Sequence, residues 1–521
     1  MRALWMTGVL SVLASGCSFT TAAGLDECET SADCGSDRVC TPEKLCLPLP
    51  VGCGTVYGSQ SPEAIPIGGL FPVHSGTGVG APIDESDEQA LNAAVLAVEQ
   101  INQRSFGGKQ FALYFCDTGN DVGRAQRQAE WLVKEKKVPA LLTAGSSQTL
   151  QVAQSVTIAA SVVTMSYSAT SPDVTDLPDK NGGQVGFVWR TSASDAIQGS
   201  VIANLLRNDA RFGAPKKVGI FYVNDPYGQG LFHIISERLD ADPKVENEGD
   251  SYTRQGDVKA ALDTLNRFDP DLTVLVGFAS DVTNILTEAA TRPNLKRDVH
   301  KWLFSDSVKD VAVLANGTAS AQAQGFYGTA PAQGTGQAFR AFQSSFKDRY
   351  NKDPSAYAYT SNAYDAMYLL ALGAAYSQGT SGAVTGPKLA EGLTKVSSAQ
   401  NSPVQLTSSS FISLAAELAA GRSVNVDGAS GALDFNNDTG EAPSPWSCGR
   451  WSATTSRPSR PSRRPGPRRD APQRLPRPEG GRRTCSSWLV RNPSRLLAPG
   501  HTSTGPRRCL LRPPSHPPHR W

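Results

Sequence analysis

The stretch that decides the fold is residues 140–172, ALLTAGSSQTLQVAQSVTIAASVVTMSYSATSP. It opens with the apolar run 140–143, and near its end the β-branched run 162–165 leads into a hydroxyl-rich turn. Between these runs, apolar residues recur at the i, i+4 and i+7 spacing of one helix face; they are Val152, Val156 and Ala159. Two strands joined by a helix form a βαβ unit, from which parallel sheets are built. The stretch therefore predicts an α/β fold.

Both predicted strands end in turns rich in Ser and Thr, at 145–149 after the first strand and at 166–171 after the second. Because the carboxyl ends of neighbouring parallel strands meet at one edge of the sheet, we expect the two turns to lie together. The first turn also opens a helix, whose free N–H groups and dipole favour an anion such as a carboxylate. One such turn would indicate only a helix cap. Two on neighbouring strands favour a crevice for a small ligand.

The two turns also carry a family resemblance. GSSQT at 145–149 and MSYSATSP at 165–172 resemble the two ligand-gripping segments of the Leu/Ile/Val-type periplasmic binding proteins. These are the type I substrate-binding proteins of amino-acid ABC importers. The resemblance extends from about Ile65 to about Pro445. It implies two doubly wound parallel-sheet α/β lobes that are joined by a three-strand hinge and close on a ligand.

Repeated strands separated by helical patterns independently favour two such lobes over one very large sheet. By resemblance, the chain crosses between the lobes at FVWRT (187–191), QGFYG (324–328) and GALDFN (431–436). The crossings assign 56–190 and 329–430 to the N-lobe, and 191–328 and 431–445 to the C-lobe.

The amino terminus predicts export. Arg2 precedes the apolar segment 3–14, which is too short to span a bilayer, and Ser15-Gly16-Cys17 follows. Small residues directly before a cysteine resemble a bacterial lipobox, so we expect 1–17 to be a lipoprotein signal peptide with Cys17 as the lipidated residue. An ordinary cleaved signal or an uncleaved start is the alternative. The expected location is the periplasmic face of a bacterial membrane, held by acyl chains.

The cysteines predict disulfides rather than a metal site. Five residues separate each of the first four after the signal from the next, and two more follow; the six are Cys28, Cys34, Cys40, Cys46, Cys53 and Cys116. Zinc sites usually contain close C-x2-4-C pairs, often with His, and neither occurs here. We expect the first four to form a small knot within a Cys-rich stalk, residues 18–55, and Cys53 to pair with Cys116. Spacing alone leaves the connectivity open. A small binding knot is the alternative role for the stalk.

Residues 446–521 differ from the rest of the chain. They hold 17 of the 50 Lys and Arg residues, all of them Arg, and only two acids, so the rest of the chain is acidic. This tail could bind a polyanion or be disordered. Because the resembled family has a strand near 446–451, we also consider a tail translated out of frame. We expect a disordered or out-of-frame tail and no nucleic-acid partner.

The resemblance also assigns ligand contacts. They are Ser146, Ser147, Thr149, Ser168, Ala169, Thr170, Tyr227, Phe278 and Asp306. Ser147, Ser168 and Thr170 would hold an α-carboxylate and ammonium. Tyr227 would cover the ligand, and Asp306 would face the ammonium. A surface-turn role is the alternative for Asp306, and a core role for Phe278. Tyr167 stands where Pro is common, and position 306 more often carries Glu, so the preferred ligand side chain stays open.

Together these features predict an extracytoplasmic solute-binding lipoprotein that captures an amino acid or a related small polar solute. It would deliver that solute to an ABC permease; a sensory module that passes its closed state to a receptor is the alternative. H-E-x-x-H, G-x-S-x-G and Walker A motifs are absent from the sequence. The glycine turn at 76–80 lacks the spacing of a dinucleotide fingerprint. We therefore expect no enzyme activity, no cofactor and no metal.

Overall fold

The computed structural model describes residues 27–29, 31–34, 38–40, 44–104 and 107–450. The expected signal peptide with Cys17, and the tail from residue 451 onward, lie outside these ranges. Among the described helices, none combines the length and the apolar character that a bilayer span requires.

The first lobe, the N-lobe, is built on a six-stranded sheet. In spatial order its strands are β3 (Cys53–Gly58), β5 (Phe111–Asp117), β4 (Ile65–Phe71), β6 (Ala140–Thr143), β7 (Val163–Ser166) and β8 (Val188–Arg190). Neighbouring strands are parallel except β3 and β5, which are antiparallel, so the sheet is mixed. The lobe therefore begins at Cys53, inside the stretch that the sequence assigned to the stalk. A half-exposed edge strand such as β3 carries little sequence signal.

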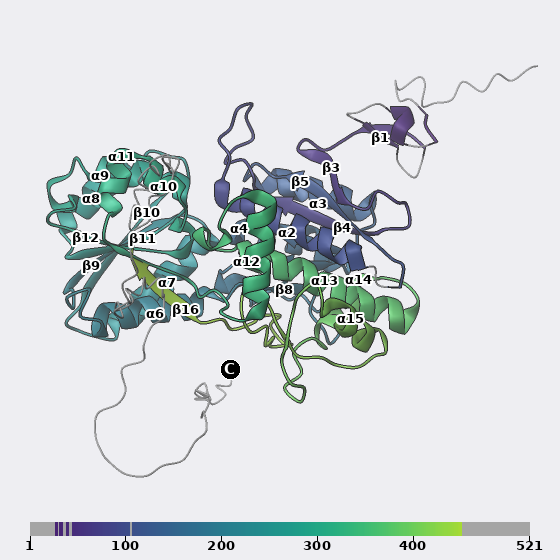
Figure 1. Ribbon diagram of the computed structural model, residues 1–521. Helices are drawn as coiled ribbons and strands as arrows, with labels where there is room; N and C mark the ends of the chain where they lie inside the picture. The colour runs from purple at the N-terminus through teal and green to yellow at the C-terminus, as the bar shows by residue number, and fades with distance from the viewer. Residues whose placement is uncertain (1–26, 30, 35–37, 41–43, 105–106, 451–521) are drawn as a thin grey trace, which may run out of the picture. The chain divides into compact units, whose positions relative to one another are not determined.

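Both faces of this sheet are covered by helices (Figure 1). Ala140 and Leu142 of β6 pack into one hydrophobic cluster with α2 and α13, whereas Leu141 packs into another with α3. Successive strand residues point to opposite faces, so a strand buried on both sides is apolar throughout. The helices of the lobe are α2 (Glu85–Arg104), α3 (Val122–Lys134), α4 (Ser146–Val152), α5 (Ile158–Ala160), α12 (Gln337–Tyr350), α13 (Thr360–Ser381), α14 (Gly386–Leu393) and α15 (Phe411–Ala419).

The deciding stretch forms the predicted βαβ unit, with one local difference. Between β6 and β7 the helix runs from α4 through a π-helical turn, η2 (Ala153–Thr157), into α5. Val152 and Val156 are buried as expected, but Ala159 is exposed. Hydrogen bonds of the i→i+5 type add a residue to the turn, so the residues that follow rotate away from the predicted face.

The second lobe, the C-lobe, carries another six-stranded sheet. In spatial order its strands are β10 (Glu246–Tyr252), β9 (Lys217–Val223), β11 (Leu272–Val276), β12 (Lys301–Phe304), β13 (Tyr327–Pro331) and β16 (Trp446–Arg450). Its helices are α6 (Asp195–Asn208), α7 (Pro226–Asp240), α8 (Lys259–Phe268), α9 (Ala279–Ala289), α10 (Ala312–Ala315) and α11 (Gly317–Ala323). The fold prediction of two α/β lobes is confirmed, with mixed rather than purely parallel sheets.

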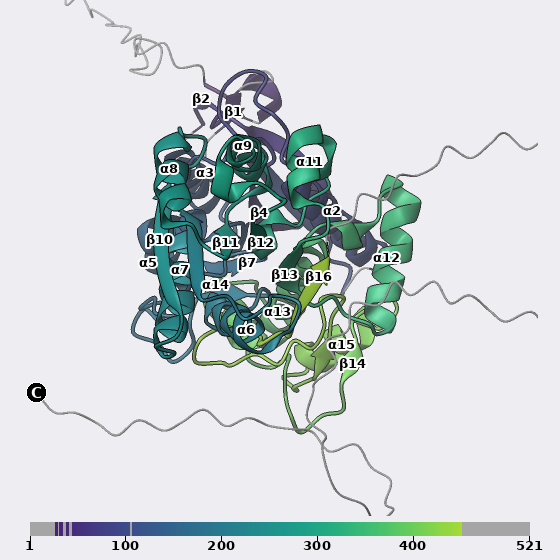
Figure 2. The same cartoon turned by 90° about the vertical axis from the view of Figure 1, so that its left-hand side faces the viewer.

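The last strand corrects a predicted boundary. β16 pairs antiparallel with β13 from Trp446 opposite Pro331 to Arg450 opposite Tyr327, at the edge of the C-lobe sheet (Figure 2). The sequence assigned these five residues to the tail, but they supply the strand that the resembled family has at this position. WSCGR shows no run of β-branched residues. Its strand conformation depends on hydrogen bonds to β13, which lies more than a hundred residues earlier.

Three segments join the lobes, as predicted, but the second and third pass between the lobes later in the chain than the predicted 324–328 and 431–436. The first leaves β8, the second continues from β13, and the third leads into β16. The Arg190 N–H donates to the Gly440 carbonyl at 2.9 Å, and the Ala332 N–H donates to the Pro445 carbonyl at 2.8 Å. The buried Arg190 guanidinium also forms an ion pair with Glu441. The three segments are therefore tied together where the chain passes between the lobes.

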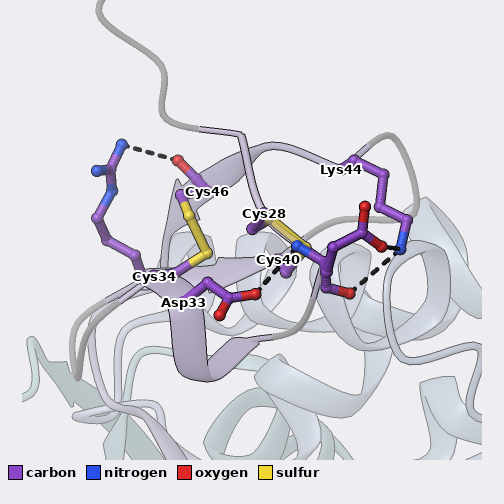
Figure 3. The surroundings of a disulfide bond; sticks show 8 residues. Cys28, Asp33, Cys34, Cys40, Lys44 and Cys46 are labelled. Carbon is purple, nitrogen blue, oxygen red and sulfur yellow. Dashed lines mark hydrogen bonds and ion pairs between the residues drawn. A yellow bond between two sulfur atoms is a disulfide. The ribbon is translucent and has the colours of Figure 1, made fainter.

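The disulfides follow the expected grouping and supply the pairing that the sequence left open. Cys28 pairs with Cys40 and Cys34 with Cys46 around η1 (Ser31–Cys34), β1 (Arg38–Cys40) and β2 (Cys46–Pro48) (Figure 3). Cys53 pairs with Cys116 and ties β3 to β5. The sulfurs of Cys28, Cys34 and Cys40 lie within 4.8 Å of one another. Metal binding requires thiolates, and these sulfurs are bonded in pairs, so the cluster is structural.

Candidate ligand-binding site between the lobes

A cavity of about 90 Å³ is lined by both lobes. At roughly 10–15 Å³ per water, it has room for several waters or for a small solute. From the N-lobe it is lined mainly by the start of α2 and by the two hydroxyl-rich turns; from the C-lobe, the polar and aromatic lining residues are Asp225, Arg254, Phe278, Ser307 and Asp310. The position agrees with the general rule that open α/β sheets bind ligands beyond the carboxyl ends of their strands.

The two hydroxyl-rich turns lie together, as the sequence predicted. Parallel pairing of β6 with β7 places Thr143 opposite Ser166, so both turns leave the sheet at the same edge. The Gly145 N–H donates to the Ser168 hydroxyl at 3.0 Å. The Ser146 hydroxyl in turn accepts the N–H groups of Thr170 and Ser171, at 3.2 and 3.0 Å. The turns therefore form one hydrogen-bonded wall of the cavity.

This wall presents unused donors to the cavity. The first intrahelical hydrogen bond of α4 runs from the Thr149 N–H to the Gly145 carbonyl, so the N–H groups of Ser146, Ser147 and Gln148 precede it. These three residues line the cavity. Among the described residues, none forms a hydrogen bond with the Ser147 hydroxyl. Free N–H groups at the start of a helix that continues to Ala160 favour a carboxylate.

Three predicted contacts of the same segments lie behind the wall. Thr149 is fully buried, and its hydroxyl bonds to the hydroxyls of Thr143 and Ser166, at 2.9 and 3.1 Å. The Ala169 carbonyl accepts from Arg190 and Ser192, and Thr170 is also buried. None of the three lines the cavity. They hold the wall in place, and their direct contact with a ligand stays a prediction.

Asp306 lies at a contact between the lobes. Its buried carboxylate accepts the Tyr227 hydroxyl at 2.7 Å and the hydroxyl of Tyr359, an N-lobe residue. Burial and the Asp306 charge hold the pKa of Tyr227 and of Tyr359 well above its usual value, so both stay protonated donors. Tyr359 lines the cavity, whereas Tyr227 and Asp306 do not. The ligand roles of Tyr227 and Asp306 stay predictions, and sequence reasoning missed Tyr359.

Sequence reasoning also missed the carboxylates of the cavity, which come from both lobes. Asp84 and Asp87 come from the start of α2 in the N-lobe, and Asp225 and Asp310 come from the C-lobe. Asp84 and Asp87 stand in DESDEQ, and acids at a helix start are typical of first-turn residues that interact favourably with the helix dipole. That local role explains the pattern without a ligand. No signal in the sequence indicates that Asp310 lies beside them.

These carboxylates have specific neighbours. The Tyr167 hydroxyl donates to Asp87 Oδ1 at 2.7 Å, and the Ser86 N–H and hydroxyl donate to Asp310 Oδ2 at 3.1 and 2.7 Å, across the lobes. Burial, followed by the charge of Asp84, raises the pKa of Asp87 to about 8. Burial raises the pKa of Asp84 to about 6, and Arg254 opposes that rise. The site therefore disfavours the ionised form of both acids.

Arg254 lies on the C-lobe side of the cavity against Phe278. Its guanidinium carbon is 3.8 Å from the centroid of the Phe278 ring, and its Nε is 3.9 Å from Asp281 Oδ2. Phe278, a predicted contact, does line the cavity, and its ring is also tilted against Tyr227. The cavity thus combines a donor-rich wall, several carboxylates, one guanidinium and aromatic surface. Such a set can hold a small polar solute through both of its charged ends.

The chain is similar to known binding proteins and receptors. The family model "Receptor family ligand binding region" matches residues 89–446. The chemotactic signal transduction system substrate-binding protein BasB of Halobacterium salinarum is 25% identical over 376 residues, which cover 72% of this chain and 84% of BasB. Glutamate receptor 2.4 of Arabidopsis thaliana is 24% identical over 54% of this chain, which spans 31% of that receptor.

Solved structures show the same fold. The isoleucine complex of LivJ, a branched-chain amino acid transporter substrate-binding protein from Streptococcus pneumoniae, has a TM-score of 0.57 at 20% identity, covering 74% of this chain and 96% of LivJ. The leucine-binding protein LivK of Thermotoga maritima has a TM-score of 0.59 at 19% identity, covering 75% and 96%. A Rhodopseudomonas palustris ABC-transporter solute-binding protein with bound 3,4-dihydroxybenzoic acid has a TM-score of 0.56 at 17% identity, covering 74% and 93%.

Proposed function

The chain belongs to the family described as the receptor family ligand binding region, with the fold of type I periplasmic binding proteins, and from this premise we propose that it is an extracytoplasmic solute-binding protein. Its solute is an amino acid or a related small polar molecule, captured reversibly without bond making. The observation that carries the proposal is the cavity of about 90 Å³ lined by donors and acids of both lobes. A ligand that contacts both lobes favours their closed arrangement.

In this proposal the solute carboxylate binds at the donor-rich wall. The N–H groups of Ser146 and Ser147 and the hydroxyls of Ser147 and Ser168 supply charge-assisted hydrogen bonds. Thr149, Ala169 and Thr170 act through the wall that they hold in place. The ammonium binds toward the carboxylates, and Phe278 contributes apolar contact.

Closure then couples binding to lobe contacts. Ser86 with Asp310 and Tyr359 with Asp306 are hydrogen bonds that cross between the lobes. A solute enters when these contacts open, and it is retained when they form again. Tyr227 and Asp306 thus support closure from the C-lobe side, through Tyr359.

The proposed setting is the outside of a bacterial membrane. Three disulfides in the described residues suit an oxidising compartment. Lipidation at Cys17 would anchor the protein, and an ABC permease would receive the solute. Several similar structures are of ABC-transporter solute-binding or substrate-binding proteins, which supports this partner.

A sensory role is the second candidate. The observation that favours it is the similarity to BasB, the substrate-binding protein of a chemotactic signal transduction system. In that case the closed lobes would be recognised by a receptor rather than a permease. Co-purification of the ligand-saturated protein with a permease would favour transport, and co-purification with a signalling receptor would favour sensing.

The test is a thermal-shift screen of the full chain against amino acids, small amides and aromatic acids. A ligand at a hundred times its dissociation constant adds about 2.7 kcal/mol to the free energy of unfolding. Mass spectrometry of the released ligand should show it unchanged, as a binding protein requires. If no member of these classes shifts the transition, the proposed solute class is wrong.

A further inference from the structure

The cavity contains more acids than its own cations can balance. Four carboxylates line it, and Arg254 is the lining residue with a permanent positive charge. Arg254 is itself shared with Asp281, which lies outside the cavity lining. Within the described part of the chain, none of the four lining carboxylates forms an ion pair. The charge of Asp310 raises the pKa of Asp84 and of Asp87, and the charge of Asp84 raises the pKa of Asp87, so these three acids lie close together.

Their hydrogen-bond partners are neutral. Asp87 accepts the Tyr167 hydroxyl, Asp225 accepts the Gly228 N–H at 2.9 Å, and Asp310 accepts donors of Ser86 and of Ala312. Hydrogen bonds from neutral donors offset part of the cost of taking a carboxylate out of water, but they supply no counter-charge. The missing positive charge must therefore come from bound protons or from the solute.

A neutral zwitterion cannot supply the missing positive charge. Its ammonium offsets one carboxylate, while its own carboxylate adds a further negative charge to the cavity. An amino acid with an amine or guanidinium side chain brings one net positive charge. A partly buried cation is favoured between acids whose other partners are neutral hydrogen-bond donors.

We propose that the preferred solute is an amino acid with a cationic side chain, whose amine or guanidinium group lies between Asp84, Asp87 and Asp310. Its α-carboxylate occupies the donor-rich wall at Ser146 and Ser147. This inference rests on the proposed function and narrows its substrate class. It also gives the contact between Ser86 and Asp310 a second role, because closure brings Asp310 to the two N-lobe acids.

Binding of such a solute is coupled to the release of protons from Asp84 and Asp87. The groups that face Asp87 are Asp84, Tyr167, Arg254 and Asp310. With a pKa of about 8 for Asp87 and about 6 for Asp84, the pair binds at least one proton near neutral pH. A cation between the two acids lowers both pKa values, so binding should release protons and should strengthen as the pH rises from 6 to 9.

Calorimetric titration of the full chain at pH 7 tests the proposal with matched ligand pairs. L-arginine is compared with L-citrulline, and L-lysine with L-norleucine, because each pair has nearly the same shape and differs in one charge. At least one cationic member should bind tenfold or more tightly than its neutral partner, with proton release detected in buffers of different ionisation enthalpy. Equal affinities within both pairs would overturn the inference and leave the proposed function in place. Absence of binding by every amino acid would overturn both.

Two variants test where the cationic group of the solute binds. Asp87→Asn should reduce the preference for the cationic member of the pair at least fivefold and diminish the proton release. Glu248→Gln removes an exposed acid of β10 and should change neither quantity. An unchanged preference in Asp87→Asn would contradict the assigned position. The ligand pairs on the unaltered protein decide the charge preference even if the variant folds poorly.

Discussion

The hydroxyl of Tyr359 in the N-lobe donates a hydrogen bond to the carboxylate of Asp306 in the C-lobe, and both side chains are buried. A hydrogen bond to a carboxylate can exist across this contact only while the lobes are together. The pair therefore links the arrangement of the lobes to the cavity, which Tyr359 lines.

Tyr359→Phe should weaken ligand binding by favouring the open arrangement. A hydrogen bond to a charged group contributes about 1.5–3 kcal/mol, and we expect a rise of about ten- to a hundredfold in the dissociation constant. Calorimetry measures this, and small-angle scattering of the ligand-free protein should show a larger radius of gyration. Tyr376→Phe is the matched control, because it removes a hydroxyl that donates to Glu391 within the N-lobe. Equal ligand affinities of the two variants would contradict the role given to Tyr359.

Substitutions of two neighbouring serines of the wall should affect ligand affinity in one case and the free energy of unfolding in the other. Ser147→Ala should lower affinity about fivefold to tenfold with little change in unfolding, because no residue in the described ranges forms a hydrogen bond with the Ser147 hydroxyl. Ser146→Ala leaves the N–H groups of Thr170 and Ser171 without their acceptor and should cost about 1–3 kcal/mol of stability. Chemical denaturation and calorimetry on both variants provide the comparison. Loss of stability in Ser147→Ala instead would show that its hydroxyl has a structural partner.

Removal of the disulfide between Cys53 and Cys116 should destabilise the N-lobe. This bridge joins residues 63 apart in the chain, and replacing both with Ser should cost about 2–4 kcal/mol. Replacing Cys28 and Cys40 with Ser is the control, since their bridge lies within the small knot and spans only 12 residues. Its loss should leave ligand affinity and the main unfolding transition unchanged. Denaturant titration without reductant measures the unfolding of both variants, and calorimetry measures their ligand affinity.

The raised pKa of Asp87 predicts a pH dependence of stability. Because the folded value, about 8, lies above the unfolded one, the associated stability is present at low pH and declines as the pH rises through 8. His300 has the opposite sign, but its pKa is lowered to about 4 from 6.5, so its contribution is complete above pH 6.5. Asp87→Asn should therefore gain stability relative to the unaltered protein between pH 6.5 and 9, without ligand. A difference that does not change with pH would show that Asp87 does not titrate there.

Truncation should distinguish β16 from the tail. A chain that ends after Arg450 keeps the edge strand and should bind and unfold like the full chain. A chain that ends after Pro445 loses the five residues paired with β13, including the buried Trp446. Loss of one buried aromatic side chain costs about 3–5 kcal/mol, so thermal unfolding should begin with the C-lobe at a lower temperature. Identical melting of both truncated chains would exclude a structural role for β16.

Much of the architecture follows from local signals in the sequence. Within residues 140–172, the spacing of apolar residues over a few positions indicates two strands and a helix. The turns that follow neighbouring parallel strands lie at the same edge of the sheet, so the wall at Ser147 and Ser168 is predictable. The grouping of the cysteines is predictable for a similar reason, since four closely spaced cysteines have few partners outside their own segment. The π-helical turn that exposes Ala159 could not be predicted, because one extra residue in a turn leaves the apolar pattern of the sequence unchanged.

The acids of the cavity depend on tertiary structure alone. Tyr167 departs from the pattern of the resembled family, and only the fold shows that its hydroxyl reaches Asp87. More than two hundred residues separate Ser86 from Asp310, and their contact exists because the two lobes meet. The periodicity of apolar residues indicates which face of a helix or strand is buried. It carries no information on which polar side chains of the two lobes face each other across the hinge. The sequence by itself thus determined two α/β lobes with hydroxyl-rich turns at one sheet edge. The contact between the lobes decided which acids line the cavity, and therefore its charge.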